Sequence, residues 1–420
     1  MTKMLCGYRV LDITQFVAGP TCSRLMAELG ADVIKVELTP IGDHARRSGL
    51  RSRKKEYANC TQSTYFAQHN HSKRSLAINL KSNKGQALVK KLIERSDVLV
   101  ENFAPGVIGR MGLSYEEVKK INPEIIMCSI SFAGQEGPLA NEPGFDYMAA
   151  AYAGITEMIG ENDRSPSQVS MAVGDSATGI SAAMAVVVAL LHRERTGEGQ
   201  FIDCSLLDTY LQMHEDYIPR VGLRGDAASP ERSGSQHPNG GPTGIFECGD
   251  GSFLQMMIMP YQWPRLLQAI GMPELEKDTR FNSPQNRRKN KYELQGIIEQ
   301  WMAKIGDRQD ILTILKSQRV PVAPVLTLQE AINHPHAIQR GAIRQIKDPF
   351  IGNFPIPGQP PIFSKWSHNN ELRAPLLGEH NEEILTTICG LDKSEIVALH
   401  ENGIINTDLT FLESPSDPLK

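Results

Sequence analysis

Asp175 is the residue of this sequence whose type and position most directly suggest chemistry. It follows Gly174 and comes immediately before an apolar run of helical character, residues 176–193. A carboxylate at the start of a helix can accept hydrogen bonds from the free N–H groups of the first turn and act as a structural cap. The same position can instead present a nucleophile where those N–H groups stabilise developing negative charge. Spacing alone leaves both interpretations open.

A second candidate for chemistry is the short segment 239–242, with the sequence Asn-Gly-Gly-Pro. As a local pattern it predicts a plain turn. Its two glycines, Gly240 and Gly241, also suit a flexible loop that closes over a reactive intermediate and excludes water.

Other familiar kinds of site lack their sequence patterns. The pair His69 and His71 has no third ligand at helical or hairpin spacing, so we expect a loop or surface position and no metal site. Neither a GxSxG hydrolase motif nor a Walker-type GxxxxGK[ST] occurs in the chain. Residues 17–20, which follow the first predicted strand, are Val-Ala-Gly-Pro rather than GxGxxG, so the dinucleotide fingerprint is missing.

The elements that must position these residues alternate over the first part of the chain. Residues 8–14 and 31–37 are predicted strands, and residues 21–29 between them form a predicted helix that Gly30 ends. The alternation continues with a helix at 88–93 and strands at 98–101 and 125–130. Such alternation predicts an α/β fold, in which helices cover both faces of a parallel sheet.

The composition changes near the middle of the chain. Residues 222–251 are rich in Gly, Pro, Ser and Asn, which is typical of a linker or an active-site loop. A predicted strand at 253–258 and predicted helices at 263–270 and 294–302 follow. We therefore expect a smaller domain at residues 222–323. A further predicted helix at 381–388 comes after a proline-rich connection.

Length, charge and cysteine content narrow the class of protein. A chain of 420 residues is too long for one ordinary core. Its net charge of −4 gives no basic field for nucleic acid or an anionic membrane, and its longest apolar stretch, residues 182–191, is about half a membrane span. Seven scattered cysteines without a CxxC pair suit reduced thiols. We expect a cytoplasmic protein without nucleic-acid or membrane partners.

Segments spread along the whole chain resemble the class III CoA-transferases, the family that includes formyl-CoA transferase and carnitine CoA-transferase. The matching segments are residues 7–14, 18–20, 29–37, 42–43, 73–75, 100–106, 110–113, 143–146, 174–175, 195–200, 237–238 and 377–380, together with Arg46. Their number and order make the resemblance specific, although each segment alone is a weak match.

The resemblance implies an enzyme that moves CoA from an acyl-CoA thioester to an acceptor carboxylic acid, such as the small dicarboxylates oxalate and succinate. It implies that Asp175 is the nucleophile, which forms first a mixed anhydride and then an aspartyl-CoA thioester. No metal and no cofactor beyond CoA as a substrate are implied. The implied fold is a Rossmann-like large domain, made of residues 1–221 and 324–420, with a small α+β domain between them. Two such chains are expected to form an interlocked homodimer.

The resemblance also assigns positions that bind CoA, and lysine and arginine suit the nucleotide phosphates. These positions are Val17, Ala18, Leu38, Ile78, Lys81, Asn102, Phe103, Arg110 and Ser131. Formyl-CoA transferases carry glutamine at the position of Val17, a basic residue at that of Leu38 and a longer glycine loop, so oxalate specificity is in doubt. From the residues alone, Arg110 could pair with a surface acid and Phe103 could belong to the core.

Two alternatives stand beside this interpretation. The first is an α-methylacyl-CoA racemase of the same superfamily, which moves an α-proton with the histidine of a GHD motif and an aspartate. Residues 144–146 are Gly-Phe-Asp here, and phenylalanine cannot transfer a proton. The second is a CoA-binding protein without turnover. Retention of Asp175 and of the loop glycines argues against it.

Overall fold

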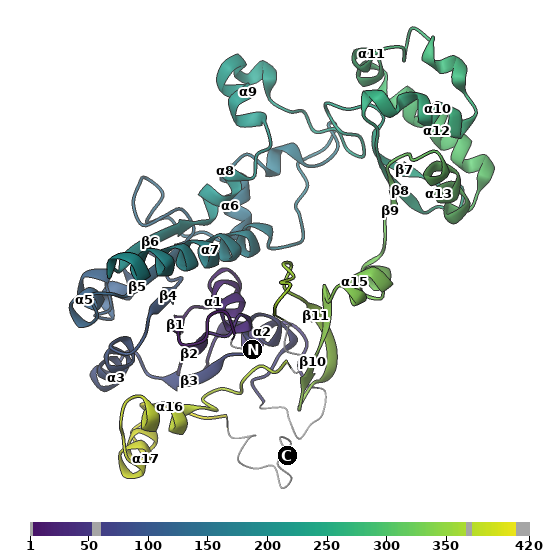
Figure 1. Ribbon diagram of the computed structural model, residues 1–420. Helices are drawn as coiled ribbons and strands as arrows, with labels where there is room; N and C mark the ends of the chain where they lie inside the picture. The colour runs from purple at the N-terminus through teal and green to yellow at the C-terminus, as the bar shows by residue number, and fades with distance from the viewer. Residues whose placement is uncertain (1–2, 53–59, 367–371, 409–420) are drawn as a thin grey trace. The chain divides into compact units, whose positions relative to one another are not determined.

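The computed structural model describes residues 3–52, 60–366 and 372–408, and the chain folds as two compact units (Figure 1). The first unit consists of Met1–Ala153, Ser170–Met213 and Pro335–Lys420. The second consists of Gly154–Val169 and His214–His334. These limits differ from the predicted boundaries at residues 222 and 323. Part of the reason is that segment 154–169 returns to the second unit, where Gly160 accepts a hydrogen bond from the backbone N–H of Gly234 at 3.0 Å.

A six-stranded sheet forms the centre of the first unit, with the order β3-β2-β1-β4-β5-β6. Its strands are β1 (Arg9–Ile13), β2 (Asp32–Leu38), β3 (Arg74–Ile78), β4 (Val98–Glu101), β5 (Ile126–Ser131) and β6 (Gln200–Ser205). Every neighbouring pair runs parallel, so the predicted parallel α/β sheet is confirmed. The chain order reverses direction between β1 and β4, as in the nucleotide-binding folds with this strand order.

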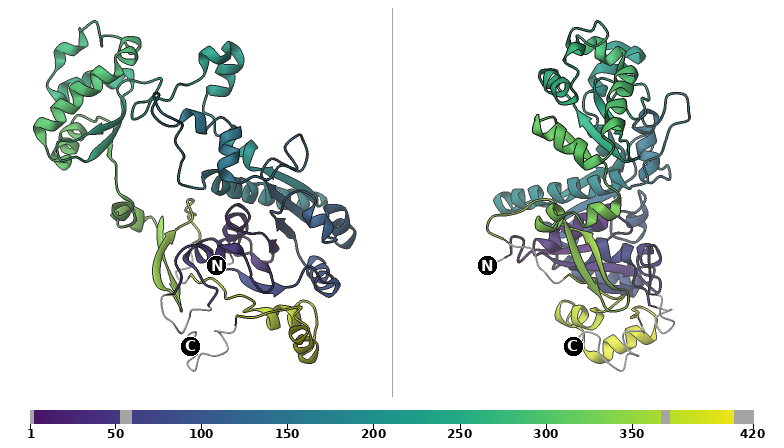
Figure 2. Two further views of the ribbon diagram at one scale, coloured as in Figure 1. Left: turned by 180° about the vertical axis from the view of Figure 1, so that it is seen from behind. Right: turned by 90° about the vertical axis from the view of Figure 1, so that its right-hand side faces the viewer.

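Helices cover both faces of the sheet. On one face α1 packs against α7, and α7 packs against β5 and β6 (Figure 2). On the other face α3, α5, α16 and α17 bury apolar side chains in a core that includes Leu11, Leu88 and Ile384. The C-terminal segment therefore completes the core that the N-terminal segment begins.

The helices of the first unit begin at short polar residues where the sequence supplies them, as Ser82 does for α3 and Ser114 for α5. These helices are α1 (Ala18–Glu28), α2 (Thr64–Asn70), α3 (Asn83–Ile93), α4 (Val107–Arg110), α5 (Tyr115–Ile121), α6 (Asp146–Tyr152), α7 (Val173–Thr196), α8 (Leu206–Gln212), α15 (Pro335–Gln339), α16 (Asn381–Thr387) and α17 (Lys393–Glu401). The antiparallel strands β10 (Ile343–Asp348) and β11 (Gly352–Pro357) complete the unit.

The second unit has its own small sheet and its own core. Strands β7 (Thr243–Glu247), β8 (Phe253–Met257) and β9 (Val322–Pro324) pair antiparallel in that order. Its helices are α9 (Tyr217–Arg224), α10 (Trp263–Ile270), α11 (Pro284–Lys289), α12 (Lys291–Ile305), α13 (Arg308–Ser317) and α14 (Leu328–Ile332). Phe246, Leu266 and Ile298 join the sheet and the helices in one apolar cluster, as the alternating pattern of β7 and β8 requires.

The expected loop or surface position is wrong for His69, which lies within α2, while His71 lies in the turn after that helix but not at the surface. Their exposed fractions are 7% and 0%, because α2 packs against α1 and draws both rings inside. Burial and nearby cations lower the pKa of His69 to about 3 and hold the pKa of His71 well below its usual value. Both rings are therefore neutral, and their surroundings are positively charged.

Helix α7 is the one helix of the described ranges that is long and apolar enough to cross a membrane by length and composition. Its buried side includes Ala182, Val186 and Leu190, which face the sheet and α1. Its other side leaves Met184 and Val188 exposed. The helix is therefore half packed into the core of the first unit.

The contact between α1 and α7 depends on Gly179. An added Cβ at this position would lie 2.5 Å from the carbonyl oxygen of Ala18 and 2.7 Å from Cβ of Thr21. Gly179→Ala should therefore push the helices apart and lower the free energy of unfolding by about 2 kcal/mol. Urea unfolding followed by circular dichroism measures the change. Gly296→Ala in α12 is the control, because nothing lies within 4 Å of its added Cβ. The control should be neutral or slightly stabilising. Equal stability of both variants would contradict the close contact.

Candidate active site

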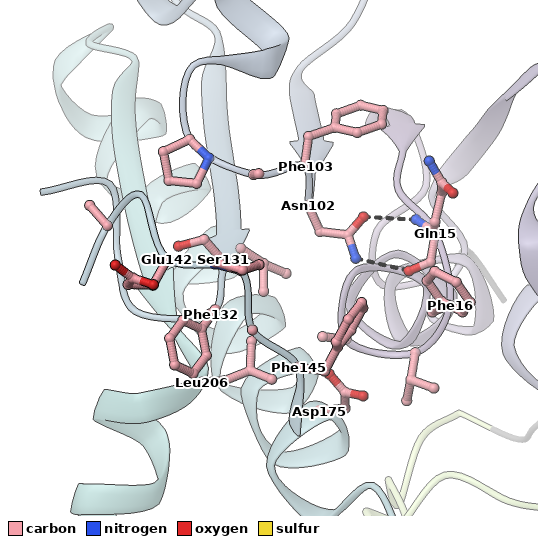
Figure 3. Close-up of a pocket in the computed structure, with 18 residues that line it drawn as sticks. Gln15, Phe16, Asn102, Phe103, Ser131, Phe132, Glu142, Phe145, Asp175 and Leu206 are labelled. Carbon is pink, nitrogen blue, oxygen red and sulfur yellow. Dashed lines mark hydrogen bonds between the residues drawn. The ribbon is translucent and has the colours of Figure 1, made fainter. Parts of the chain in front are cut away.

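A cavity of about 330 Å³ opens at the carboxyl ends of strands β1, β4, β5 and β6 (Figure 3). It lies where the strand order reverses between β1 and β4, the place where open parallel sheets bind their ligands. The residues that line it are Gln15, Phe16, Val17, Ala18, Asn102, Phe103, Ala104, Pro105, Ile130, Ser131, Phe132, Ala140, Glu142, Pro143, Gly144, Phe145, Asp175 and Leu206. None of these lining residues is a lysine or an arginine, and its two carboxylates belong to Glu142 and Asp175.

Asp175 lies inside the first turn of α7 and not in front of the helix as the sequence suggested. The helix begins at Val173, and its cap residue Ala172 offers no side chain that could bond to the backbone. The Asp175 carboxylate accepts no hydrogen bond from any residue that the structure describes, so it does not act as a cap. Burial, and then the negative charge of Asp146, raise its pKa to about 7. A carboxylate that is partly desolvated and not hydrogen-bonded is a stronger nucleophile than one in water.

Asp146 fills the capping role that Asp175 leaves open. Its Oδ1 accepts a hydrogen bond from the backbone N–H of Asp175 at 2.7 Å. Its Oδ2 accepts one at 3.0 Å from the hydroxyl of Tyr210 in α8, and that hydroxyl accepts the N–H of Gly174 at 3.0 Å. Asp146 and Tyr210 therefore hold the first turn of α7 while the Asp175 side chain faces the cavity. Gly174 permits this contact, because an added Cβ would lie 2.2 Å from the Tyr210 ring.

The loop after β1 forms the opposite wall of the cavity and is fixed by three side chains. The amide of Asn102 holds Gln15 from both sides, accepting its N–H and donating to its carbonyl oxygen, each at 2.8 Å. Oδ1 of Asp43 accepts the N–H of Phe16 at 3.1 Å, and Nζ of Lys35 donates to the carbonyl oxygen of Thr14 at 2.6 Å. These bonds hold Phe16 at a φ of +65°, a conformation that a non-glycine residue seldom adopts.

The first turn of α1 presents backbone N–H groups at this wall. Among the described residues, nothing accepts a hydrogen bond from the N–H of Ala18 or Gly19, and Pro20 has no N–H. Ala18 lines the same cavity as Asp175. Two free N–H groups at the positive end of a helix form a place for an oxyanion. An added Cβ at Gly19 would lie 2.4 Å from Thr14, so this turn accepts only glycine there.

Sequence reasoning missed Asp146, Tyr210 and Tyr65 as parts of the site. Burial, and then the charge of Asp175, raise the pKa of Tyr65 to about 12, so this phenol keeps its proton near Asp175. Tyr65 belongs to α2, far from Asp175 along the chain. Asp146 stood in a matching segment, 143–146, but nothing in the spacing linked it to Asp175 or Tyr210.

The predicted CoA-binding positions fall into two groups. Val17, Ala18, Asn102, Phe103 and Ser131 line the cavity with Asp175, and Leu38 lines a small neighbouring recess with Phe103. Outside the cavity are Ile78, Lys81 and Arg110.

Each of these three outer positions has a definite environment. Ile78 is fully buried in the core, and Lys81 is exposed. Arg110 is exposed and lies over Gly106, where its Nη1 would be 3.3 Å from an added Cβ. It pairs with no acid in the ranges the structure describes, so the alternative that Arg110 pairs with a surface acid has no support there. Phe103 packs on the edge of the core and also lines the cavity.

Gly240 and Gly241 belong to the second unit, between α9 and β7. An added Cβ on Gly241 would lie 2.9 Å from the backbone carbonyl oxygen of Arg287, so the loop packs closely against α11. Their predicted role next to Asp175 stays a prediction. Within residues 3–52, 60–366 and 372–408, no group of three or more His, Cys, Asp or Glu could hold a metal ion.

Comparison with known proteins adds a family to this geometry. The family model described as CoA-transferase family III matches residues 5–381. The succinyl-CoA–D-citramalate CoA-transferase of Chloroflexus aurantiacus is 35% identical over 404 residues, which is 96% of this chain and 98% of that protein. The succinyl-CoA:glutarate CoA-transferase of Mus musculus is 33% identical and covers 96% of this chain and 90% of its own.

A solved structure gives the same assignment. The crystal structure of a CAIB/BAIF family protein from Brucella suis superimposes with a TM-score of 0.80 at 32% sequence identity. The match covers 92% of this chain and 100% of that one. The resemblance inferred from the sequence is therefore confirmed, and the chain belongs to CoA-transferase family III.

Proposed function

We propose that this CoA-transferase moves CoA between dicarboxylic acids and that Asp175 is its nucleophile. The observation that carries the proposal is the state of the Asp175 carboxylate. It lines a cavity at the carboxyl edge of the sheet, accepts no hydrogen bond from any described residue and is held by a turn that Asp146 caps. A carboxylate needed only for structure would be paired or hydrogen-bonded in the fold.

The reaction begins when an oxygen of Asp175 attacks the thioester carbonyl of the donor. The C–S bond breaks, CoA leaves as a thiolate, and a mixed anhydride of Asp175 and the donor acid remains. The thiolate then attacks the aspartyl carbonyl of this anhydride, which releases the donor carboxylate and leaves an aspartyl-CoA thioester. The acceptor carboxylate repeats the two steps in reverse, and Asp175 is regenerated as a free carboxylate.

Each addition places negative charge on a carbonyl oxygen. Ala18 lines the cavity together with Asp175, so its free N–H group can donate to that oxygen, with the free N–H of Gly19 next to it in the turn. Burial of Asp175 lowers the cost of removing water from the nucleophile when the thioester arrives, because part of that water is already excluded.

The dicarboxylate class rests on two observations. The relatives described above are named for succinyl-CoA with citramalate or glutarate as the second acid. The cavity of about 330 Å³ is also of a size for a small acid, and Val17 and Phe145 add apolar surface to its wall. We place the CoA phosphates near Arg110 and Lys81, which are exposed cations without an acidic partner in the described ranges.

The racemase alternative lacks a proton carrier at the required place. Phe145, at the histidine position of that mechanism, lines the cavity and cannot titrate. A CoA-binding protein without turnover would have no use for a desolvated Asp175. Neither alternative is favoured by a feature of the site.

The remaining proposals concern assembly. We propose a homodimer, interlocked as in the resemblance, because α7 exposes an apolar stripe that a monomer would leave in water. The residues of this stripe are Ile180, Met184, Val187, Val188 and Leu191. We further propose that Gly240 and Gly241 shield the anhydride from water and that the enzyme works in the cytoplasm.

Trapping the covalent intermediate tests the role of Asp175. Incubation with succinyl-CoA and hydroxylamine or borohydride should modify Asp175, as mapped by peptide mass spectrometry. Asp175→Asn should lose transfer by at least about a thousandfold, because no nucleophile remains. Modification of another residue, or turnover by Asp175→Asn, would overturn the assignment. Exchange of a substrate α-proton with solvent would support the racemase instead.

The free energy of unfolding of Asp175→Asn also distinguishes a nucleophile from a structural cap at this position. A carboxyl with a raised folded pKa costs stability above that pKa, and the cost disappears below its unfolded pKa of about 4. Asp175→Asn should therefore be about 2 kcal/mol more stable than wild type near pH 8, with the gain shrinking as the pH falls. Loss of a helix cap would instead destabilise the variant by about 1 kcal/mol. Urea unfolding across this pH range decides between the two.

The charge of Asp146 should set part of the pH dependence of transfer. Protonated Asp175 cannot attack, so kcat/KM should fall as the pH drops through about 7. Asp146→Asn removes the neighbouring charge, so the acid limb should move to lower pH by roughly one unit. Glu142→Gln is the control, because Glu142 lines the cavity but does not contribute to the raised pKa of Asp175. An unchanged acid limb in Asp146→Asn would contradict this coupling.

Light scattering tests the proposed dimer. The protein should show a mass about twice the 46.4 kDa of one chain at micromolar concentration. Lys at positions 184 and 188, in Met184→Lys with Val188→Lys, should lower this mass or prevent folding, because both side chains would be buried charged in the interface. A wild-type monomer would sink the proposal, and so would recovery of the protein in a membrane fraction.

A further inference from the structure

The loop at residues 237–242, called the glycine loop below, packs against helix α11 of the same unit. The backbone N–H of His237 donates to the carbonyl oxygen of Thr243 at 2.8 Å and closes the base of the loop. An added Cβ on Gly241 would lie 2.9 Å from the carbonyl oxygen of Arg287 and 3.0 Å from the carbonyl carbon of the same residue. The backbones of the loop and of α11 are therefore in direct contact.

Two arginines of α11 donate to carbonyl oxygens of the glycine loop. Nε of Arg287 donates to the carbonyl oxygen of Gly241 at 3.3 Å. Nε of Arg288 donates to the carbonyl oxygen of Pro238 at 3.1 Å. A hydrogen bond from a charged donor is stronger than one between neutral groups. Because Pro238 and Gly241 flank residues 239–240, the two bonds hold the loop on both sides of its tip.

Arg287 is buried without a carboxylate to balance its charge. Only 4% of this residue is exposed, and no described residue forms an ion pair with it. Its Nη1 donates to the carbonyl oxygen of Phe281 at 2.9 Å, and its Cζ lies 4.7 Å from the centroid of the Trp263 ring. Burial lowers the pKa of this guanidinium, which nevertheless stays charged. A buried charge is costly unless it is hydrogen-bonded, so the carbonyl oxygen of Gly241 is one of the few groups that stabilise it.

The same contacts leave one peptide group of the loop free, the one between Gly240 and Gly241. Among the described residues, nothing accepts a hydrogen bond from the N–H of Gly241 or donates one to the carbonyl oxygen of Gly240. The N–H of Asn239, by contrast, donates to Nδ1 of His237 at 3.2 Å. The arginines therefore bind the carbonyl groups at the edges of the loop and leave the peptide between the two glycines unpaired.

We propose that Arg287 and Arg288 are positioning residues, which hold the glycine loop in the shape that keeps water from the covalent intermediate on Asp175. The inference rests on the proposed function, in which this loop shields the mixed anhydride. Neither arginine lines the cavity of Asp175, so both act through the loop. Arginine suits this role because its rigid planar group donates to several oxygens at once, whereas lysine carries a single flexible ammonium.

A loop that is not held in place admits water to the intermediate. Water then attacks the mixed anhydride in place of the CoA thiolate, which releases the donor acid and regenerates Asp175. In the balance, one acyl-CoA and one water give one carboxylic acid and one CoA thiol. The ratio of hydrolysis to transfer therefore reports the position of the loop. A simple loss of folded enzyme lowers both rates together and leaves this ratio unchanged.

The test uses the full-length enzyme with succinyl-CoA. Hydrolysis is measured as free CoA thiol without an acceptor, and transfer as glutaryl-CoA formed with glutarate. Arg287→Gln should raise the ratio of hydrolysis to transfer by at least about fivefold, because a charge-assisted bond to the loop is lost. Arg288→Gln should raise it in the same direction. Arg287→Lys should restore part of the wild-type ratio, since lysine can still donate to one carbonyl oxygen.

Lys289→Gln is the matched control. Lys289 is an exposed cation of the same helix that forms no hydrogen bond with the described part of the loop, so its loss should leave the ratio at the wild-type value. An unchanged ratio in Arg287→Gln would overturn the proposal. So would an equal rise in Lys289→Gln, because the cause would then be the charge of the helix and not the bonds to the loop.

Circular dichroism shows first whether each variant folds. If Arg287→Gln does not fold, Arg288→Gln decides alone, because Arg288 is exposed and its loss leaves the buried contacts of Arg287 intact. An unchanged ratio in that variant would then overturn the proposal. A wild-type enzyme without transfer, or without an adduct on Asp175, would refute the proposed function and this inference with it. Wild-type transfer with an adduct on Asp175 and no change in the arginine variants would refute this inference only.

Discussion

The site depends on a group of charges buried beneath the loop after β1. Asp12, Lys35 and Asp43 are all fully or almost fully buried, and Nζ of Lys35 lies 2.9 Å from Asp43 and 3.7 Å from Asp12. Lys73 also belongs to this group, with its Nζ 2.9 Å from Asp12. Although burial favours the neutral form of Asp12, Lys35 and Lys73 hold its pKa well below the usual range. Removing one member of such a group leaves an unpaired buried charge and costs about 3–5 kcal/mol. This arrangement is therefore rigid. Lys35 also donates to the carbonyl oxygen of Thr14, and Asp43 also accepts the N–H of Phe16.

The rigid group of charges also fixes the first turn of α1, which follows this loop directly. With Thr14, Gln15 and Phe16 tied to Lys35, Asn102 and Asp43, α1 begins at Ala18 directly after Val17, and the N–H of Ala18 stays free at the cavity. The first turn of α7 is held from the other side by Asp146. Two helix N-termini thus meet one cavity, but only α1 keeps its N–H groups free. The turn of α7 gives its N–H groups to Asp146 and Tyr210, and this leaves Asp175 without a backbone partner.

Sequence patterns predicted the limits of those strands and helices whose burial follows from the residues of the element itself. Strand β4 and helix α10 have the predicted limits, and β1, β2, β5 and β8 agree within a residue or two, because branched side chains and apolar spacing record burial along one element. Strands β3 and β6 were not predicted. Arg74 in β3 reaches Asp32 of the neighbouring strand, and five of the six residues of β6 are not buried, so neither has the pattern of a buried strand. The return of segment 154–169 to the second unit is a contact between distant residues and leaves no trace in composition.

Within the site, sequence patterns pointed only to Asp175 and to the loops that carry a family pattern. Asp175 stood out because glycine and a helical run surround it, but a helix start suits a cap and a nucleophile equally. What excludes the cap is the carboxylate of Asp146, which lies 29 positions earlier and takes the N–H of Asp175. A separation of that length does not predict a contact from the sequence, and the contact forms only because the fold packs α6 against α7. The Asp175 carboxylate is therefore left without a hydrogen bond, because the carboxylate of Asp146 is placed to accept the backbone N–H of the first turn in its stead.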